Sequence, residues 1–489
     1  MSNVTQVANY TRKFNDIKSD RDMESVTLLM RTMAAPRLGS AIASNRQDRF
    51  FLGCTFGKLV SVAKGCVLRR LLDFLDMVLD KPVIIIGAGV AGLSLAQVLQ
   101  HKGVPFKVFE RDPGSDYRSQ GRSMSLHFCL QALKQAIGAD YYESMPRKSS
   151  VNTYRPTDYG FALIDGKTQR TMIRVDHDVM KAMDLEAYRI NRVRFRKWLL
   201  EGINIEWAKR FSSFKVIDNG IQVKFTDGTI VDGSILVGAD GVNSAVCQQL
   251  MGSDKFTSIT KVNPLYTLIG MRWVDEDTRN QFAKLSPTQF YAYGRMDNGE
   301  MIGMFVSLND VDPSRQDEYQ MMWCISRYDE RDLIPKPESD SERLDQAKAW
   351  ASEAFEGLIR SLVCDTPPGT LVSRLKIRER EPHAIMNSDT LGGRLTLIGD
   401  AAHPMTNFRG EGGNHAILDA ILLANALSDA HKGKNSLAEA VRTYQEEMVP
   451  RGRSAVIESD NAVKLMHTSP NGMLEAMKAL YVHPACKNQ

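Results

Sequence analysis

The chain has 489 residues, of which 43% are hydrophobic and 25% are charged. This length allows two or three domains. The composition is that of an ordinary globular protein and excludes a disordered chain, a collagen-like fibre and a small disulfide scaffold. Lys and Arg number 62 and Asp and Glu number 58, so a net charge of +4 indicates no electrostatic footprint for DNA or RNA. The seven cysteines form no C-x-x-C pair, which favours reduced intracellular thiols.

The N-terminal 76 residues carry no usable motif. Their most apolar stretch, Phe50 to Leu68, contains Lys58 and Lys64, and a charge at the centre of a spanning helix costs about 2.5–3.5 kcal/mol. The stretch also lies too far along the chain for a signal peptide. We expect no membrane span and a cytoplasmic location. Residues 1–76 are interpreted as a poorly ordered extension, with a small functional domain as the alternative.

The next segment predicts a strand, a helix and a second strand. Val83 to Ile86 is an uninterrupted β-branched or aliphatic run, as in a strand buried on both faces of a parallel sheet. Leu93 to Gln100 continues as a helix, and Phe106 to Phe109 forms the second strand. This order is that of a βαβ unit.

A glycine motif lies between the first strand and the helix. Gly87 allows a tight turn, Gly89 lets a pyrophosphate approach the backbone, and Gly92 allows close packing of helix and strand. The helix N-terminus then favours phosphate through its free N–H groups and its dipole. Glu110, at the end of the second strand, can accept hydrogen bonds from ribose hydroxyls. This acid favours FAD or NAD over NADP at this site.

Two later motifs follow buried strands. Ile221 to Phe225 and Thr229 to Val231 flank Asp227-Gly228, a hairpin signal. The run from Ile235 then ends in Gly-Ala-Asp-Gly, with Asp240 as its acid.

The second of these motifs follows a predicted strand that begins at Leu395. Asp400 closes that strand, and Gly410, Gly412 and Gly413 form a turn before a helix predicted over Ala416 to Leu427. This helix N-terminus is a second place where a polar cofactor can bind.

The three motifs, in this order, resemble the single-component FAD-dependent aromatic hydroxylases of the para-hydroxybenzoate hydroxylase type. The chain is most similar to the fungal branch that serves secondary-metabolite pathways, from about Lys81 to His467. The resemblance implies an α/β fold. A Rossmann-like FAD-binding domain of the glutathione-reductase type would carry an inserted mixed β-sheet substrate domain and C-terminal helices.

The resemblance also implies roles for residues. The first motif and Glu110 would hold the ADP half of FAD, Asp240 would serve FAD and NAD(P)H, and Asp400 would bind the ribityl chain. The turn at Gly410 to Asn414 would lie against the flavin. Arg118 and the segment Tyr188 to Arg192 resemble stretches that approach the cofactor. The expected cofactor-binding set is Gly87, Gly89, Gly92, Glu110, Arg122, Arg192, Asp240, Asp400, Gly412 and Gly413.

Three positions depart from the family pattern. Cys247 replaces an arginine that usually follows the second motif, which removes an ion pair. Asn407 stands where many relatives have proline, and Glu411 where glutamine is common. An acid near the flavin disfavours an anionic reduced flavin unless a cation offsets it, and Arg409 is the candidate for that cation.

We expect an N-terminal part of the FAD-binding domain at 77–253 and a substrate-binding sheet and lid at 254–393. The GDAAHP motif (Gly399 to Pro404) and C-terminal helices are expected at 394–489. Strand-like runs alternate with turns in the middle segment, and Glu342 to Leu362 reads as one amphipathic helix. Two pairs in these strands, Tyr291 with Tyr293 and Met304 with Val306, each share a face. We interpret both pairs as core rather than pocket.

The implied activity is an FAD monooxygenase that uses NAD(P)H and O2 to hydroxylate or epoxidise an aromatic, polyketide-like or alkaloid-like small molecule through a C4a-hydroperoxyflavin. The cofactor carries this chemistry, so no catalytic side chain is assigned. We predict no metal, because the histidines lack ligand spacing with Asp, Glu or Cys. The alternatives are a flavin oxidase or dehydrogenase without NAD(P)H, and an inactive flavin-binding protein. Substrate identity, NADH versus NADPH, and oligomeric state stay open.

Overall fold

The computed structural model describes residues 80–117, 121–182, 185–382, 390–469 and 472. The predicted extension over residues 1–76 lies outside the described residues. Among the described helices, none combines the length and the apolar character needed to cross a membrane.

A five-stranded parallel sheet forms the centre of the first layer, in the order β19-β11-β1-β2-β7. Its middle strand β1 is buried on both faces and pairs in parallel with β2 and β11, because branched apolar side chains on both faces need cover from both sides. The predicted βαβ unit is confirmed. The strands are β1 (Val83–Ile86), β2 (Phe106–Phe109), β7 (Ile205–Glu206), β11 (Ile235–Gly238) and β19 (Leu395–Leu397).

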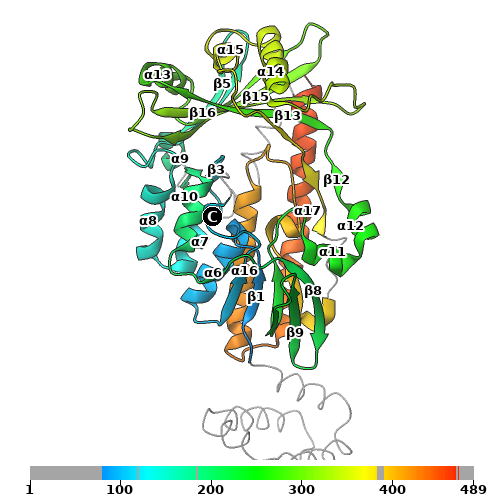
Figure 1. Ribbon diagram of the computed structural model, residues 1–489. Helices are drawn as coiled ribbons and strands as arrows, with labels where there is room; N and C mark the ends of the chain where they lie inside the picture. Colours follow the sequence, from blue (N-terminus) through cyan, green and yellow to red (C-terminus); the bar gives the residue numbers. More distant parts are fainter. Residues whose placement is uncertain (1–79, 118–120, 183–184, 383–389, 470–471, 473–489) are drawn as a thin grey trace, which may run out of the picture. The chain divides into compact units, whose positions relative to one another are not determined.

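Helices pack around this sheet and share one hydrophobic core with it. Figure 1 places α6 and α16 close to β1, with α7, α8 and α10 to one side. The helices are α6 (Val90–His101), α7 (Leu130–Ile137), α8 (Ala139–Ser149), α10 (Arg192–Leu200), α16 (Gly412–His431) and α17 (Leu437–Thr468).

Smaller strands and short helices lie outside the five-stranded sheet. The hairpin predicted at Asp227-Gly228 is confirmed, since β9 pairs antiparallel with β10 around it. The strands are β3 (Ser123–Leu126), β6 (Tyr188–Asn191), β8 (Phe211–Ile217), β9 (Gly220–Phe225), β10 (Ile230–Gly233), β12 (Lys261–Val262) and β18 (Arg378–Glu379). The helical segments are α9 (His177–Ala182), α11 (Ala245–Met251), α12 (Ser253–Ile259), η2 (Thr390–Gly393) and η3 (Gly399–Ala401).

The second layer is a seven-stranded sheet in the order β17-β13-β16-β15-β14-β4-β5. It is mixed, because β14 pairs in parallel with β4 while the other neighbours are antiparallel. The strands are β4 (Gly160–Asp165), β5 (Thr171–Asp176), β13 (Leu265–Val274), β14 (Gln289–Arg295), β15 (Met301–Val311), β16 (Tyr319–Tyr328) and β17 (Ser373–Leu375).

The predicted boundary at residue 254 needs a correction. β4 and β5 lie within 77–253, yet both belong to the seven-stranded sheet. β4 pairs with β14. Without β4, the backbone groups on that side of β14 would be left unpaired at the edge of the sheet. The substrate-side layer therefore draws strands from both sides of the predicted boundary.

One face of the seven-stranded sheet packs against helices, and the other faces a cavity. Met304 and Val306 lie in a buried core, as predicted for that pair. Three helices share this core: α13 (Glu276–Leu285), α14 (Asp340–Ala354) and α15 (Gly357–Cys364). Tyr291 lies on the opposite face with Phe305, and both line a large cavity. Tyr291 is buried in a small hydrophobic cluster with Leu163 and Met466 and also lines the cavity. Its interpretation as core is therefore confirmed, and the exclusion of a pocket role was wrong.

The single helix predicted over Glu342 to Leu362 is two helices. The chain leaves helical geometry at Phe355 (φ −126°, ψ 160°) and restarts at Gly357, which has a φ of +54°. This break lets the Phe355 ring pack against Gly166 and Gly294, where an added Cβ would lie 2.4 Å and 3.2 Å from ring atoms. Burial of the Phe355 ring is favourable and offsets the backbone hydrogen bonds lost where the helix is interrupted.

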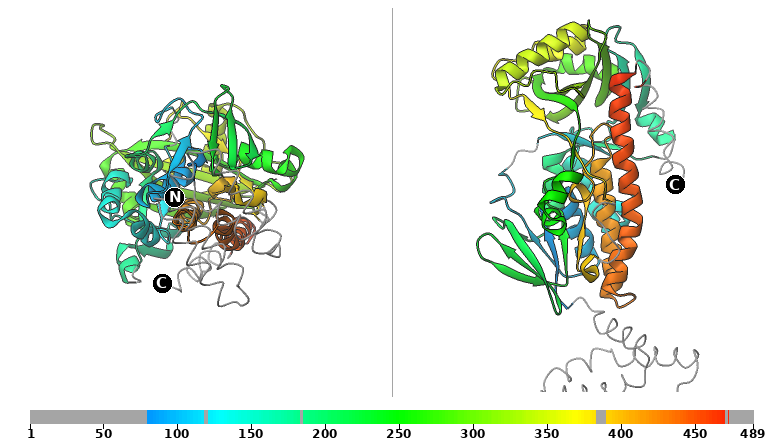
Figure 2. Two further views of the ribbon diagram at one scale, coloured as in Figure 1. Left: turned by 90° about the horizontal axis from the view of Figure 1, so that it is seen from below. Right: turned by 90° about the vertical axis from the view of Figure 1, so that its right-hand side faces the viewer.

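Helix α17 connects the two layers. It packs along α16 beside the five-stranded sheet and contacts β15 and β16 of the seven-stranded sheet. Figure 2 shows this helix running from one layer to the other. A capping box, in which Ser436 and Glu439 exchange hydrogen bonds, fixes its start.

Phe355→Ala should lower the free energy of unfolding by about 3–5 kcal/mol, because it empties a fully buried ring site. Leu371→Ala is the control, since that side chain is 76% exposed and its removal should change stability by about 0.5 kcal/mol or less. Thermal and urea unfolding of the full chain measure both. Equal effects of the two substitutions would contradict the account of the helix break.

Candidate active site

One cavity joins the two layers. Its volume is about 1410 Å³, and its wall runs from Gly89 and Asp400 at the five-stranded sheet to Tyr291 and Phe305 on the seven-stranded sheet. The end at the five-stranded sheet lies beyond the carboxyl ends of β1, β11 and β19, where open α/β sheets bind ligands. The volume exceeds the about 300–1,000 Å³ usual for a single small-molecule site.

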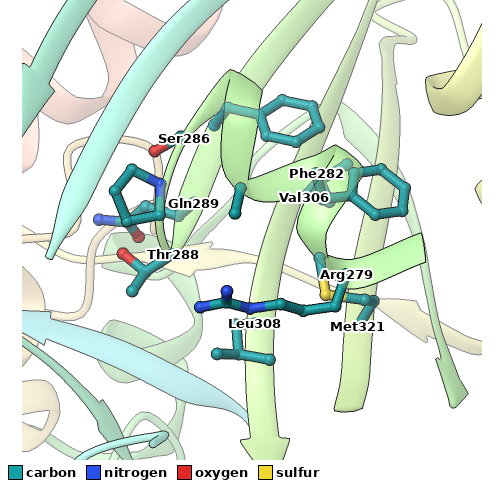
Figure 3. Close-up of a pocket in the computed structure, with 11 residues that line it drawn as sticks. Arg279, Phe282, Ser286, Thr288, Gln289, Val306, Leu308 and Met321 are labelled. Atoms are coloured by element: carbon teal, nitrogen blue, oxygen red, sulfur yellow. The ribbon is translucent and has the colours of Figure 1, made fainter. Parts of the chain in front are cut away.

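A second, small pocket lies on the other face of the seven-stranded sheet. Figure 3 shows Arg279 and Phe282 of α13 beside Leu308 and Met321 of the strands. Its volume is about 10 Å³, which is space for about one water molecule. It is too small for a substrate.

The three motif glycines meet three different constraints. A Cβ at Gly87 would lie 2.4 Å from the carbonyl oxygen of Ala239, and Gly87 has a φ of +109°. A Cβ at Gly92 would lie 2.0 Å from the carbonyl oxygen of Gly87. A Cβ at Gly89 would meet no atom within 4 Å, because this residue faces the cavity at the start of α6. The turn therefore leaves room for a ligand at Gly89 alone.

Two charged residues hold this turn in place. Glu110 accepts hydrogen bonds from the N–H groups of Ala88 (2.8 Å) and Asp112 (3.1 Å). Arg196 of α10 donates from Nε to the carbonyl oxygen of Ala88 at 2.8 Å. The Glu110 carboxylate thus supports the turn and is not part of the cavity wall, so its predicted ribose contact stays a prediction.

Asp240 sits behind the cavity wall. Its carboxylate accepts hydrogen bonds from Ser244 and from the N–H groups of Ala245 (2.7 Å) and Val246 (3.2 Å). Burial raises the pKa of Asp240, and these hydrogen bonds oppose the rise. The carboxylate therefore fixes the start of α11, while its neighbour Gly241 lines the cavity.

Arg380 lies near Cys247, the residue that replaces the arginine of the family pattern. The guanidinium of Arg380, a fully buried residue, donates to the carbonyl oxygen of Ala401 at 3.0 Å and to Thr260 at 3.0 Å. Burial lowers the pKa of Arg380, and nearby Cys247, Asp400 and Asp240 oppose this. Arg380 also donates to the carbonyl oxygen of Val242 at 3.4 Å, so it links the loops of the second and third motifs. Nothing in the sequence around Arg380 signals these contacts.

Asp400 lines the cavity together with two predicted arginines. Arg122 and Arg192 line the same wall as Asp400. Burial lowers the pKa of Arg192, the Asp400 carboxylate raises it, and Arg122 lowers it further. The structure brings these three predicted residues together. Arg118 lies outside the described residues.

The second helix N-terminus also faces the cavity. Gly412 and Gly413 begin α16 and line the wall, and a Cβ at Gly413 would lie 2.4 Å from Met124. Asn414 accepts a hydrogen bond from the N–H of His127 at 2.8 Å and donates to the carbonyl oxygen of Ser125 at 3.1 Å. These bonds hold the glycine turn against β3.

The expected partner of Glu411 is confirmed. Arg409 donates to both Glu411 oxygens, at 3.1 Å and 3.0 Å. Burial alone would raise the pKa of Glu411, but hydrogen bonds with His415 and Arg409 hold it at about 2. The acid is therefore ionised and its charge is offset beside the cavity wall.

His403 shapes the loop after β19 through a buried contact with Asp419. Its Nε2 lies 2.7 Å from Asp419, which also accepts hydrogen bonds from Arg451 (2.8 Å) and from the N–H of Gly399 (2.8 Å). Burial would raise the pKa of Asp419, but His403 and Arg451 hold it well below its usual value. The same contacts give Arg451 a structural role, because its charge balances the buried Asp419 carboxylate.

The residues fit an FAD-sized dinucleotide. An open glycine turn at one helix N-terminus and a second helix N-terminus both offer N–H donors to anionic or carbonyl groups, and Asp400 offers an acceptor between them. Within the described residues, no group of three or more His, Cys, Asp or Glu side chains could hold a metal ion.

The comparison with protein families agrees with this geometry. A family described as "FAD binding domain" matches residues 80–459. The chain belongs to this family and, within it, to the fungal branch of FAD-dependent monooxygenases related to para-hydroxybenzoate hydroxylase. The predicted fold class, FAD binding and enzyme class are confirmed.

Two of the similar curated proteins come from fungi. The FAD-dependent monooxygenase thnD of Trichoderma harzianum is 32% identical, covering 76% of this chain and 91% of the relative. The FAD-dependent monooxygenase phnB of Penicillium herquei is 29% identical, covering 79% and 91%.

Solved structures share the fold. HpxO of Klebsiella pneumoniae, complexed with FAD and uric acid, has a TM-score of 0.61 at 19% identity, covering 84% of this chain and 93% of that one. PqsL of P. aeruginosa, in complex with 2-aminobenzoylacetate, has a TM-score of 0.61 at 16% identity, covering 81% and 99%.

Gly89→Val should weaken FAD binding about tenfold or more, because its side chain would fill the space at the helix N-terminus. The melting temperature of the FAD-free protein should not fall, since no protein atom lies within 4 Å of the added Cβ. Gly92→Ala should instead lower stability by about 1–3 kcal/mol or more through its backbone clash. FAD titration and thermal unfolding separate the two effects. Full FAD affinity in Gly89→Val would contradict the assignment.

Proposed function

We propose that the protein uses NAD(P)H and O2 to insert one oxygen atom into an aromatic, polyketide-like or alkaloid-like small molecule, as part of secondary metabolism. The single observation that carries this proposal is the continuous cavity from the glycine turn of α6 to the apolar face of the seven-stranded sheet. When bound, FAD supplies the electron transfer and oxygen activation.

The five-stranded layer provides the cofactor contacts in this proposal. The N–H groups at Gly89 and the start of α6 bind the pyrophosphate, and Asp400 accepts hydrogen bonds from the ribityl hydroxyls. Gly412 and Gly413 present N–H groups at the start of α16. Support comes from the position of all of these residues on one cavity wall.

The seven-stranded layer provides the substrate end. Phe161, Tyr291, Phe305 and Met322 from four adjacent strands line the wall there. An apolar wall of this kind favours a flat hydrophobic substrate and excludes water from the reacting centre. No acid or base on this wall is required, because the cofactor carries the difficult chemistry.

The cavity volume supports a transient second cosubstrate. About 1410 Å³ leaves space beyond the about 300–1,000 Å³ of one ligand site. A βαβ unit for a second dinucleotide does not occur among the described elements. NAD(P)H would therefore approach across the FAD-binding layer rather than bind in a domain of its own.

The purified full-length chain should show the absorbance spectrum of oxidised flavin. Under anaerobic conditions NADPH or NADH should bleach it, and air should restore it, because hydride transfer and reoxidation by O2 are both part of the proposed cycle. An oxidised spectrum that neither nucleotide reduces, even with substrate candidates present, would contradict NAD(P)H use and favour a flavin oxidase or an inactive flavin protein.

Asp400→Ala should weaken FAD binding by about 10- to 150-fold, the equivalent of about 1.5–3 kcal/mol for a hydrogen bond to a charged group. Asp429→Ala is the matched control, since this acid pairs with Lys434 at the surface. Equilibrium dialysis of FAD measures both affinities. The ribityl assignment fails if Asp400→Ala and the control bind FAD equally well.

A further inference from the structure

Arg189 is a buried cation at the substrate end of the cavity. Only 5% of the residue is exposed, and it lies in the cavity wall. Its guanidinium donates to three serine hydroxyls, at 2.9 Å to Ser307, 3.2 Å to Ser125 and 2.8 Å to Ser123. Its carbon centre lies 5.3 Å from the ring centroid of Phe305.

The charge of Arg189 has no acid to balance it among the described residues. Burial lowers the pKa of Arg189 to about 9, and the group that opposes this is the phenol of Tyr159, not a carboxylate. Burial in turn raises the pKa of Tyr159 even though Arg189 lowers it, so the phenol stays neutral. A buried guanidinium bound only to neutral hydroxyls is costly unless an anion joins it.

The serine hydroxyls do not need the arginine. Ser307 also donates to the carbonyl oxygen of Leu308 at 2.8 Å, and Ser123 lies 3.3 Å from the same oxygen. Ser125 exchanges hydrogen bonds with Gln289, at 2.9 Å and 3.2 Å. Because each hydroxyl has another partner, saturation of these serines does not account for a cation at this place.

Not all N–H groups of the Arg189 guanidinium are used by the serines. Five N–H groups are available on an arginine side chain, and three of them are used by the serines. The other two N–H groups make no hydrogen bond to the described residues, and two is the number of donors that a carboxylate or an ionised phenol accepts.

We propose that Arg189 binds an anionic group of the substrate, so that the enzyme selects aromatic or polyketide-like molecules that carry a carboxylate or an ionised phenol or enol. This inference rests on the proposed function, because it assigns the substrate end of the same cavity. Arg189 is then a specificity-determining residue, and the apolar wall around Phe305 and Tyr291 holds the ring that bears the anion.

The test compares two probes of the same shape and different charge. Naphthalene-2-carboxylate and naphthalene-2-carboxamide are titrated into the FAD-loaded full-length protein at pH 7, with calorimetry and the flavin difference spectrum as readouts. The wild-type protein should bind the carboxylate about tenfold more tightly or better, as expected for charge-assisted hydrogen bonds. Equal affinities, or tighter binding of the amide, would overturn the proposal.

Substitutions assign the effect to the residue. Arg189→Met should bring the ratio of the two affinities close to one, and Arg189→Lys should keep part of the preference. Arg174→Met is the control, because this arginine pairs with Asp176 away from the cavity, and it should keep the full preference. A preference that survives in Arg189→Met would contradict the assignment.

Thermal unfolding separates binding from a structural role. Arg189→Met should not lower the melting temperature, since it removes a buried unpaired charge and leaves each serine with a partner; a clear fall would support a structural role and count against the proposal. If the variant does not fold, the wild-type preference decides alone. Calorimetry does not depend on reduction of the flavin, so a failed NADPH test with a retained anion preference would reject only the proposed function.

Discussion

The close approach of two loops at the end of the five-stranded sheet is the constraint on which the site depends. The turn at Gly87 lies so near Ala239 that a side chain at residue 87 would overlap the backbone. Helix α6 begins beside this contact, and Gly92 packs against the same turn. These contacts bring the first helix N-terminus and the second motif together at one end of the cavity.

The other end of the cofactor region depends on contacts between distant parts of the chain. Arg380 joins the loops after β11 and β19, and Asn414 ties the start of α16 to the segment after β3. Helix α17 then contacts both sheets. The two layers are therefore held around the cavity by side chains and by one long helix, and the cavity is a consequence of that arrangement.

Local patterns explain what could be predicted from the sequence. The run from Val83 and the glycines after it determine strand, turn and helix through nearby residues, and the turn at Asp227-Gly228 determines its hairpin in the same way. Asp400 and Gly412 were found because they follow a strand and precede a helix. Each of these signals lies within about one element of the residue that it concerns.

Long-range contacts explain what could not be predicted. The pairing of β4 with β14 joins residues far apart in the chain, and no local pattern marks β4 as its partner. The break at Phe355 depends on space beside Gly166 and Gly294, which a helical period does not report. Arg189 lies next to the recognised Arg192, but its burial without a carboxylate becomes visible only when β3, β6 and β15 meet.

The central claim is that one bound FAD spans both helix N-termini. Hydrogen exchange of the backbone amides, measured with and without FAD on the full-length protein, tests it most directly. The account predicts slower exchange on FAD binding in two separate segments, Gly87 to Leu93 and Gly410 to Asn414, with little change at the small pocket around Phe282. Protection of only the first segment, or of neither, would contradict the shared cavity as the cofactor site.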